Sequence, residues 1–440
     1  MSIRSIFITV LGRSRRTPRL GRHTGRHIAV ISASLAVTTS IIVLGWPAPV
    51  AAPIRAGLVQ TKAFMESAFT VRDVPNTQQT TPAPLSYDAV PNIPAPATNF
   101  VTDQQALGIA AGSSLPSLDD QQLAARLDGI KATGARWIRL DFDWSLIQPK
   151  DSQTYDWSTY DRLVAAINTR NIAILAILDY TPAWARQSAC NSTSKCAPAS
   201  TAQFAAFAAA ASHRYATKGM HYWEIWNEPN SRDFWQPAAN PAQYVALLRD
   251  TYTALHQADI LAYVITAGLS PQATSNGSYA PYDFLAATYA SGAHGYFDAV
   301  GDHPYTFPLS PADNNSDDAW TQMARPVQSL RSLMLANGDG GKKIWITEFG
   351  APTGGPGPVS TVANPNLDAH PYVVDEGRQA LLLTDAINLY HTYNWAGPFF
   401  YYTYQDSGTD PSTNENFFGL ITAAGVHKQA YAVFQAAATN

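Results

Sequence analysis

The stretch Trp223-Glu224-Ile225-Trp226-Asn227-Glu228-Pro229-Asn230 decides how the rest of the chain is interpreted. It ends an apolar run that starts at His221 and is predicted to form a strand up to Trp226. Pro229 has no amide hydrogen and cannot continue a strand ladder, so the strand must stop before it. The stretch therefore predicts a carboxylate, Glu228, held at a strand end among aromatic side chains.

A second run of the same kind is Lys343-Ile344-Trp345-Ile346-Thr347-Glu348-Phe349-Gly350. It also predicts a strand, and it also places a glutamate, Glu348, where the strand ends. Retaining glycoside hydrolysis uses two carboxyl groups about 5–5.5 Å apart, one as acid and base and one as nucleophile. Glu228 and Glu348 are therefore the candidate catalytic pair.

Outward from these two runs, short apolar segments alternate with amphipathic ones. Strands are predicted at 107–111, 137–142, 172–179, 221–226, 263–268, 299–303, 343–347 and 398–404. Helices are predicted at 119–133, 158–170, 201–217, 241–257, 281–291, 318–337, 374–392 and 427–437. Strict alternation indicates parallel strands with helical crossovers, and the number of repeats predicts an α/β fold, the (β/α)8 TIM barrel. A doubly wound open sheet is the alternative, although residues 108–112 match its glycine-rich phosphate turn poorly.

Catalytic groups of such a barrel lie at the C-terminal ends of its strands. Asn227 could hydrogen-bond the sugar 2-hydroxyl, a contact that strengthens in the transition state. Arg139 is a candidate for contact with the sugar, and it could also pair with Glu224 or with Glu348; pairing with Glu348 would favour the ionised nucleophile. Glu224 itself is interpreted as a buried structural carboxylate.

Further candidates follow the other strands. Tyr305 could donate a hydrogen bond to Glu348, and His303 could bind a sugar hydroxyl or tune the pair. Asp179 could line the cleft. Aromatic faces suit pyranose rings, and the candidates for such stacking are Trp184, Trp235 and Tyr404. No serine elbow, P-loop or HExxH zinc motif is present, so the chemistry is expected to need neither a metal nor a cofactor.

The two ends of the chain differ in charge. Residues 1–52 contain seven arginines and no acid, which leaves 22 Lys and Arg against 33 Asp and Glu, a net charge of −11, in the rest. An acidic body argues against nucleic acid as a partner. The arginines precede an uncharged run at 28–46, about the length of a membrane span, and then small residues.

The predicted organisation is therefore a signal peptide or membrane anchor at 1–52, a linker rich in Pro, Thr and Ala at 53–104, and the barrel at 105–440. An exported protein is expected either to be secreted or to stay tethered to the outer face of the cytoplasmic membrane, touching the membrane only through its N-terminal segment. In such a protein Cys190 and Cys196 are expected to form a disulfide, with two free thiols as the alternative.

The motifs together resemble the clan A glycoside hydrolases, most closely family 39 and next family 5. The resemblance rests on IRLDFDW (138–144), ILDYTPAWA (177–185), WEIWNEPN (223–230), HPY (303–305) and WITEFG (345–350). It implies a retaining double displacement with Glu228 as acid and base, Glu348 as nucleophile and Asn227 as the 2-hydroxyl contact. Many clan members carry a Trp at the end of strand eight, where this chain has a run of tyrosines.

The sequence thus predicts a retaining glycoside hydrolase that cleaves an extracellular polysaccharide or oligosaccharide. Two other hypotheses remain open: a carbohydrate-binding barrel without turnover, and a transglycosylase that remodels envelope glycans. A binding module has no need of both glutamates, and product analysis would separate transfer from hydrolysis.

Overall fold

Parallel strands closed into a barrel form the centre of the molecule. The structure is a computed structural model that describes residues 93–95, 105–190, 192–313, 315, 318–365 and 373–439. The predicted signal or anchor at 1–52, and all of the predicted linker except 93–95, lie outside the described residues. Among the described residues, none of the helices combines the length and the apolar character needed to span a bilayer.

The barrel contains eight strands of the described chain, paired in the order β1-β10-β7-β6-β5-β4-β3-β2. Strand β1 pairs in parallel with both β2 and β10, which closes the sheet. The (β/α)8 prediction is therefore confirmed, and the open sheet is wrong. The barrel strands are β1 (Leu107–Ala110), β2 (Trp137–Asp143), β3 (Ala173–Asp179), β4 (Tyr222–Ile225), β5 (Tyr263–Thr266), β6 (Ala299–Asp302), β7 (Lys343–Phe349) and β10 (Ala396–Tyr402).

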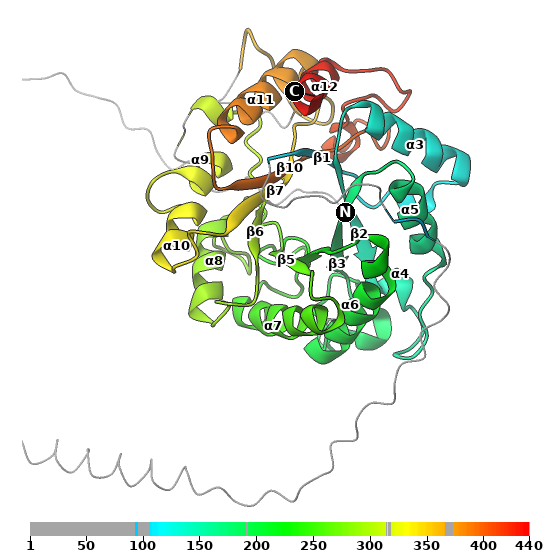
Figure 1. The fold of residues 1–440 in the computed structure, drawn as a ribbon. Coiled ribbons are helices and arrows are strands. Elements are labelled where there is room, and N and C mark those ends of the chain that lie inside the picture. Colours follow the sequence, from blue (N-terminus) through cyan, green and yellow to red (C-terminus); the bar gives the residue numbers. More distant parts are fainter. Residues whose placement is uncertain are drawn as a thin grey trace, which may run out of the picture. The chain divides into compact units, whose positions relative to one another are not determined.

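Helices surround these strands, as Figure 1 shows. The α-helices are α3 (Asp120–Ala132), α4 (Trp144–Ile147), α5 (Ser158–Asn168), α6 (Thr201–Tyr215), α7 (Pro241–Ala258), α8 (Pro281–Ala290), α9 (Ala319–Ala324), α10 (Leu330–Ala336), α11 (Glu376–Tyr390) and α12 (Gln429–Thr439). The short 3₁₀ turns are η2 (Leu115–Ser117), η3 (Ala183–Ala185), η4 (Ala216–Lys218), η5 (Pro311–Asp313) and η6 (Asn414–Phe417). The starts follow ordinary capping chemistry: at α7 the Asn240 side chain accepts the amide of Gln243, and Pro241 fills the first turn.

Two features differ from the predicted elements. The helix expected over 318–337 is two helices, α9 and α10, because Pro326 lies between them and cannot donate the backbone hydrogen bond that a continuous helix requires. A small parallel pair, β8 (Val359–Ser360) and β9 (Val373–Val374), lies between β7 and α11 and was not predicted. Neither feature changes the order of the barrel strands.

The inside of the barrel is filled by large aromatic rings near the N-terminal ends of its strands. Trp137 and Trp345 meet edge to face with ring centroids 5.4 Å apart, and Phe400 packs against both. Gly108 permits this packing, since a Cβ there would lie 2.7 Å from Trp137 Cβ and from the Phe400 ring. Strand side chains alternate between the two faces, so Arg139 points into the same interior one layer closer to the mouth.

Candidate active site

Glu228 and Glu348 come together at the C-terminal end of the barrel. Glu228 follows β4, Glu348 is the second-last residue of β7, and His303 follows β6. One oxygen of each carboxylate and one ring nitrogen of His303 all lie within 4.8 Å of one another. The distances alone would allow these three side chains to bind a metal ion, but all three are engaged in hydrogen bonds within the site.

Arg139 lies beneath the pair and connects three strands. Its Nε and Nη2 donate to the two oxygens of Glu224 at 2.6 and 2.9 Å, and its Nη1 donates to Glu348 Oε1 at 2.6 Å. A further bond runs from Nη2 to Asn227 Oδ1 at 2.9 Å. The predicted pairing is thus found with both glutamates. The predicted sugar contact is corrected, because Arg139 is only 2% exposed and its donors are turned to protein carboxylates and an amide.

Glu224 has the structural role that its position predicts. It is fully buried and also accepts the backbone amide of Gly268 at 2.8 Å. Its carboxylate is therefore satisfied by a guanidinium and an amide, as a buried charge requires. Glu224 anchors Arg139, and Arg139 in turn positions Glu348.

Tyr305 and His303 reach the pair from the end of β6. The Tyr305 hydroxyl donates to Glu348 Oε2 at 2.7 Å, which confirms that predicted contact. His303 Nδ1 lies 2.9 Å from Glu228 Oε1 and 3.7 Å from Glu348 Oε2. His303 is fully buried, so the structure supports the tuning role and not the direct contact with a sugar hydroxyl.

These contacts shift the pKa values of Glu348 and His303 in opposite directions. Burial would raise the pKa of Glu348, but the charges of His303 and Arg139 and the hydrogen bonds from Tyr305 and Arg139 lower its pKa below the ordinary value. For His303, burial lowers the pKa, and the Glu348 charge and the Glu228 hydrogen bond outweigh it, so the pKa is raised. Glu348 is thereby held as an ionised carboxylate.

Asn227 stands between Arg139 and the mouth. Because its Oδ1 accepts from Arg139, its orientation is fixed and its NH₂ group is the free end. Among the described residues no partner takes a hydrogen bond from that NH₂ group, and the residue is 9% exposed. This arrangement is suited to donating a hydrogen bond to a sugar hydroxyl next to Glu228.

The predicted stacking residues are not all at the mouth. Trp184, in η3, is partly buried and donates through Nε1 to the Gln148 carbonyl at 2.8 Å. Trp235 is only 2% exposed and packs against Trp226, with ring centroids 5.1 Å apart. Trp235 is therefore corrected from an open platform to a core residue, because the loop after β4 folds its ring inward.

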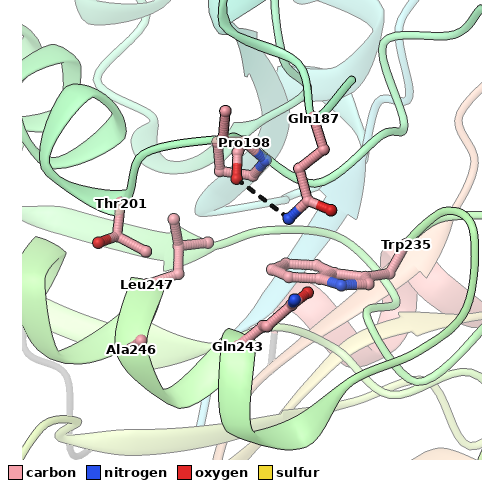
Figure 2. Close-up of a pocket in the computed structure, with 8 residues that line it drawn as sticks. Gln187, Pro198, Thr201, Trp235, Gln243, Ala246 and Leu247 are labelled. Carbon is pink, nitrogen blue, oxygen red and sulfur yellow. Dashed lines mark hydrogen bonds between the residues drawn. The ribbon is translucent and has the colours of Figure 1, made fainter. Parts of the chain in front are cut away.

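Figure 2 shows Trp235 on the wall of a cavity of about 170 Å³ between the loops that follow β3 and β4. Gln187 and Gln243 border the same cavity, and α7 contributes Leu247. Neither Glu228 nor Glu348 lines it. The cavity is therefore separate from the candidate catalytic centre.

Tyr404 is also corrected, and Tyr402 takes its place. A Cβ on Gly129 of α3 would overlap the Tyr404 hydroxyl, so Tyr404 lies outside the barrel against that helix. Strand β10 ends at Tyr402, so Tyr404 lies beyond the end of the strand. The charges of Glu415, Glu348 and Glu228 act on Tyr402, whose pKa burial raises well above the ordinary value. The alternation of Phe400 and Tyr402 into the interior is the signal that could have identified Tyr402.

Asp179 ends β3 beneath the surface of the cleft. It is fully buried, and both its oxygens lack a hydrogen-bond donor among the described residues. Burial, reinforced by the charges of Asp141 and Asp143 on the neighbouring strand, raises its pKa well above the ordinary value. Asp179 therefore lies beneath the cleft surface, where burial favours the protonated form of its carboxyl group, and the prediction that it lines the cleft surface is corrected.

The loop after β3 carries the disulfide that the sequence predicts. Cys190 and Cys196 are bonded, with Cα atoms 5.6 Å apart. The free-thiol alternative is therefore wrong. The disulfide closes a small loop beside the strand that leads to Glu228.

The sequence profile of one family matches this chain. It is the family described as Cellulase (glycosyl hydrolase family 5), and it covers residues 102–373. That range is more than half of the 440 residues. No curated protein sequence matches the chain.

Three solved structures illustrate the similarity in fold. A family 39 glycoside hydrolase from Bacteroides cellulosilyticus WH2 has 19% identity and a TM-score of 0.57, over 77% of this chain and 64% of that one. A monomeric β-xylosidase from Caulobacter crescentus CB15 has 20% identity and a TM-score of 0.53, over 77% and 69%. A family 5, subfamily 18 protein from Streptomyces cattleya, in complex with Manβ1-4GlcNAc, has 14% identity and a TM-score of 0.56, over 76% and 80%.

At these identities the structures establish the fold alone, and the chain spans less than two thirds of the first of them. Both families named by the motifs are represented, family 5 by the profile and family 39 among the structures. The resemblance to clan A is confirmed. The chain belongs to the cellulase family, glycosyl hydrolase family 5, within clan A of the glycoside hydrolases.

Proposed function

We propose that this protein is a retaining glycoside hydrolase that cleaves O-glycosidic bonds of an extracellular polysaccharide or oligosaccharide by double displacement. The observation that carries the proposal is the approach of the Glu228 and Glu348 carboxylates to within 4.8 Å. Inverting enzymes separate the two carboxyl groups by about 6.5–9.5 Å to admit a water between them. The shorter separation supports attack by one carboxylate on the sugar itself.

In the first step Glu348 attacks the anomeric carbon and the bond to the leaving oxygen breaks. Arg139 and Tyr305 each hold one oxygen of Glu348, at 2.6 and 2.7 Å, which fixes the attacking carboxylate. Glu228 gives its proton to the leaving oxygen. A covalent ester between Glu348 and the sugar results.

In the second step Glu228 takes a proton from water, and the water oxygen attacks the anomeric carbon of the ester. The sugar leaves with its original configuration and Glu348 is released as a carboxylate. A ring nitrogen of His303 lies 2.9 Å from Glu228 Oε1, within hydrogen-bond distance of the group that gives and takes the proton. Asn227 donates to the 2-hydroxyl as the oxocarbenium-like state forms.

The substrate is proposed to be a β-linked glycan. Two of the similar structures are a β-xylosidase and a protein bound to the β-linked disaccharide Manβ1-4GlcNAc. The location outside the cell rests on the arginine-rich start and apolar run of residues 1–52. In this setting the protein is secreted or tethered to the outer face of the cytoplasmic membrane.

Hydrolysis of aryl β-glycosides of xylose, mannose and glucose, together with β-1,4-linked polysaccharides, tests the proposal. Glu348→Gln is expected to lose at least about 10³-fold in kcat, and Glu228→Gln to lose most of its activity on substrates with poor leaving groups. Glu376→Gln is the matched control, because Glu376 begins α11 and bonds the amide of Gln429. Proton NMR of the first product should show the retained anomer.

The outcomes separate the three hypotheses. Turnover with inversion would contradict the double displacement. Saturable glycan binding without turnover would favour the carbohydrate-binding barrel. Main products that are longer than the starting oligosaccharide, formed even at a low concentration of acceptor sugar, would favour the transglycosylase. Normal hydrolysis by both glutamine variants would place the chemistry elsewhere in the chain.

A further inference from the structure

Lys195 is held at the rim of the catalytic cleft by a rigid loop. The loop is closed by the Cys190–Cys196 disulfide. Its backbone is also tied on both sides: the Thr181 amide donates to the Ser194 carbonyl at 2.7 Å, and the Gln236 amide donates to the Lys195 carbonyl at 3.0 Å. These bonds attach Lys195 to the segments that follow β3 and β4. The position of its Cα is therefore fixed relative to Glu228.

The Lys195 ammonium lacks the anionic partner that comparable lysines have. It lies 3.6 Å from the centroid of the Phe234 ring and 5.9 Å from that of Tyr180. Within the described residues it makes no ion pair. Lys342 also lies over an aromatic ring, at 4.0 Å, yet it pairs with Asp339 at 3.0 Å. The buried Lys428 likewise pairs with a carboxylate, at 2.7 Å.

An aromatic face compensates a cation only in part. Burial lowers the pKa of Lys195, and the strongest charge acting against this effect is that of Glu228. The ammonium has three N–H donors, so a half-buried ammonium without an acceptor is incompletely satisfied. A ligand that brings a negative charge to this point would supply the anionic partner that Lys195 lacks.

The position of Lys195 identifies the part of the substrate that it would meet. Its ammonium lies over Tyr180, which directly follows β3, and over Phe234, in the segment after β4 that also contains Glu228, and the Glu228 charge is the strongest carboxylate charge that acts on it. In a retaining mechanism the acid and base residue stands beside the leaving oxygen and the sugar attached to it. Lys195 therefore faces the leaving side of the scissile bond.

Glu415, in η6 after β10, adds a third carboxyl group near Glu228 and Glu348. Burial, together with the charges of Glu348 and Glu228, raises the pKa of Glu415 to about 7, and the charge of Lys195 acts against this rise. An anionic group that approaches Glu415 would meet carboxyl groups, whereas one that approaches Lys195 would meet a cation.

We propose that Lys195 binds a negatively charged substituent, a carboxylate or a sulfate, on the sugar at the leaving side, so that the substrate is an acidic polysaccharide. This inference rests on the proposed retaining mechanism, because that mechanism assigns the leaving side to Glu228. A neutral hydroxyl could accept a hydrogen bond from Lys195 but would not neutralise its charge. The acidic sugar is thus preferred over its neutral counterpart.

Binding to the inactive full-length Glu348→Gln protein tests the proposal without turnover. The probes are three β-1,4-linked glucose hexasaccharides: the neutral one, one oxidised to carboxylates at C6 and one sulfated at O6, each titrated by calorimetry. We expect at least one acidic probe to bind roughly 10-fold more tightly than the neutral probe, the strength of one charge-assisted hydrogen bond. Adding Lys195→Met should abolish this preference, and adding Lys195→Arg should keep it. The probe that is preferred distinguishes carboxylate from sulfate.

Lys342→Met is the matched control, since it removes another lysine that stacks on a ring but has its own carboxylate partner. High salt should weaken the acidic probes only where Lys195 is present. Equal affinity for all three probes, a preference that survives Lys195→Met, or no binding of either acidic probe would each overturn the inference. Failure of turnover in the wild-type protein would instead count against the proposed function, because these titrations involve no turnover.

Discussion

Each oxygen of Glu348 is held by a different residue, and this determines its charge. Tyr305 donates to Oε2 and Arg139 to Oε1. Both contacts act only on the ionised form, so both contribute to the lowered pKa of Glu348. The nucleophile is thus prepared by neighbours that do not themselves touch the anomeric carbon.

Replacing Tyr305 with Phe should expose this dependence. Loss of the hydroxyl removes one of the groups that lower the pKa of Glu348, so that pKa should rise. In the proposed mechanism Glu348 must be ionised to attack, and the acidic limb of the kcat/KM profile should therefore move to higher pH. Activity at a pH on the acidic limb of the wild-type profile should fall about 10-fold, the loss expected for one hydrogen bond to a charged group. Tyr289→Phe is the control, since Tyr289 lies in α8 and donates to Asp339, which precedes the start of β7, whereas Glu348 lies near the end of that strand.

A Tyr305→Phe profile with an unmoved acidic limb and a lower kcat at every pH would contradict this account. It would mean that the hydroxyl orients the carboxylate or binds the sugar without stabilising its charge.

At the scale of elements, the candidate catalytic residues lie at strand ends, and Gly268 sets how closely the ends of β5 and β6 approach each other. Gly268 follows β5, donates its amide to Glu224 and accepts the amide of Glu228 at 3.2 Å. A Cβ at this position would overlap the rings and hydroxyl of its neighbours, His303 and Thr347. Only a residue without a side chain allows β5 and β6 to bring His303 under the catalytic pair.

Gly268→Ala should therefore reduce both stability and activity. Overpacking of this kind lowers the free energy of unfolding by about 1–3 kcal/mol. Displacement of His303 from Glu228 should lower kcat more than it changes KM. Urea unfolding and steady-state kinetics measure the two effects. Gly341→Ala is the control, because no atom lies within 4 Å of a Cβ there, and its free energy of unfolding should change by less than about 0.5 kcal/mol.

Much of this arrangement could be predicted because barrel strands impose a strict alternation. The strand ends located Glu228, Glu348, Tyr305 and His303, and the interior direction of Arg139 gave its partners. Trp235 was missed because position in a loop does not say whether a ring is folded inward.

Tyr402 was missed for a different reason. The predicted strand extended to 404, whereas β10 ends at Tyr402. Because side chains alternate between the two faces, a strand that ends two residues earlier still has an inward-facing last residue. That residue is Tyr402, so the prediction selected Tyr404 wrongly. The break at Pro326 was visible in the sequence but was overruled by the apolar pattern around it.

Across the whole molecule, several acids are buried without full compensation. Asp302 at the end of β6 is 2% exposed, and burial raises its pKa to about 8 against the charge of His303. Burial also raises the pKa of Asp141 to about 7 despite the charge of Arg139. In the folded state these groups bind protons more tightly than in the unfolded chain.

The free energy of unfolding should consequently depend on pH. The contribution of Asp302 is complete below its ordinary pKa of 3.8 and is lost as pH rises through about 8. One such group gives a slope of at most about 1.4 kcal/mol per pH unit. Asp302→Asn, which stays neutral, should flatten the decline between these limits, as measured by urea unfolding at several pH values. Asp120→Asn, at an exposed position in α3, should leave the decline unchanged. A decline of equal steepness in Asp302→Asn would show that other groups cause it.

The aromatic floor of the barrel has a kinetic consequence. Trp137, Trp345 and Phe400 are each at most 1% exposed, so the interior is closed at its N-terminal end. The departing sugar and the incoming water must then pass through the same opening, at the C-terminal end of the barrel, and the sugar has to leave before water can attack. In the proposed double displacement, the lifetime of the ester on Glu348 is thereby set by the exchange of sugar and water through that opening. A sugar that returns before water arrives can take the glycosyl group from the ester and release Glu348 as a carboxylate, so the ratio of transfer to hydrolysis should rise with acceptor concentration.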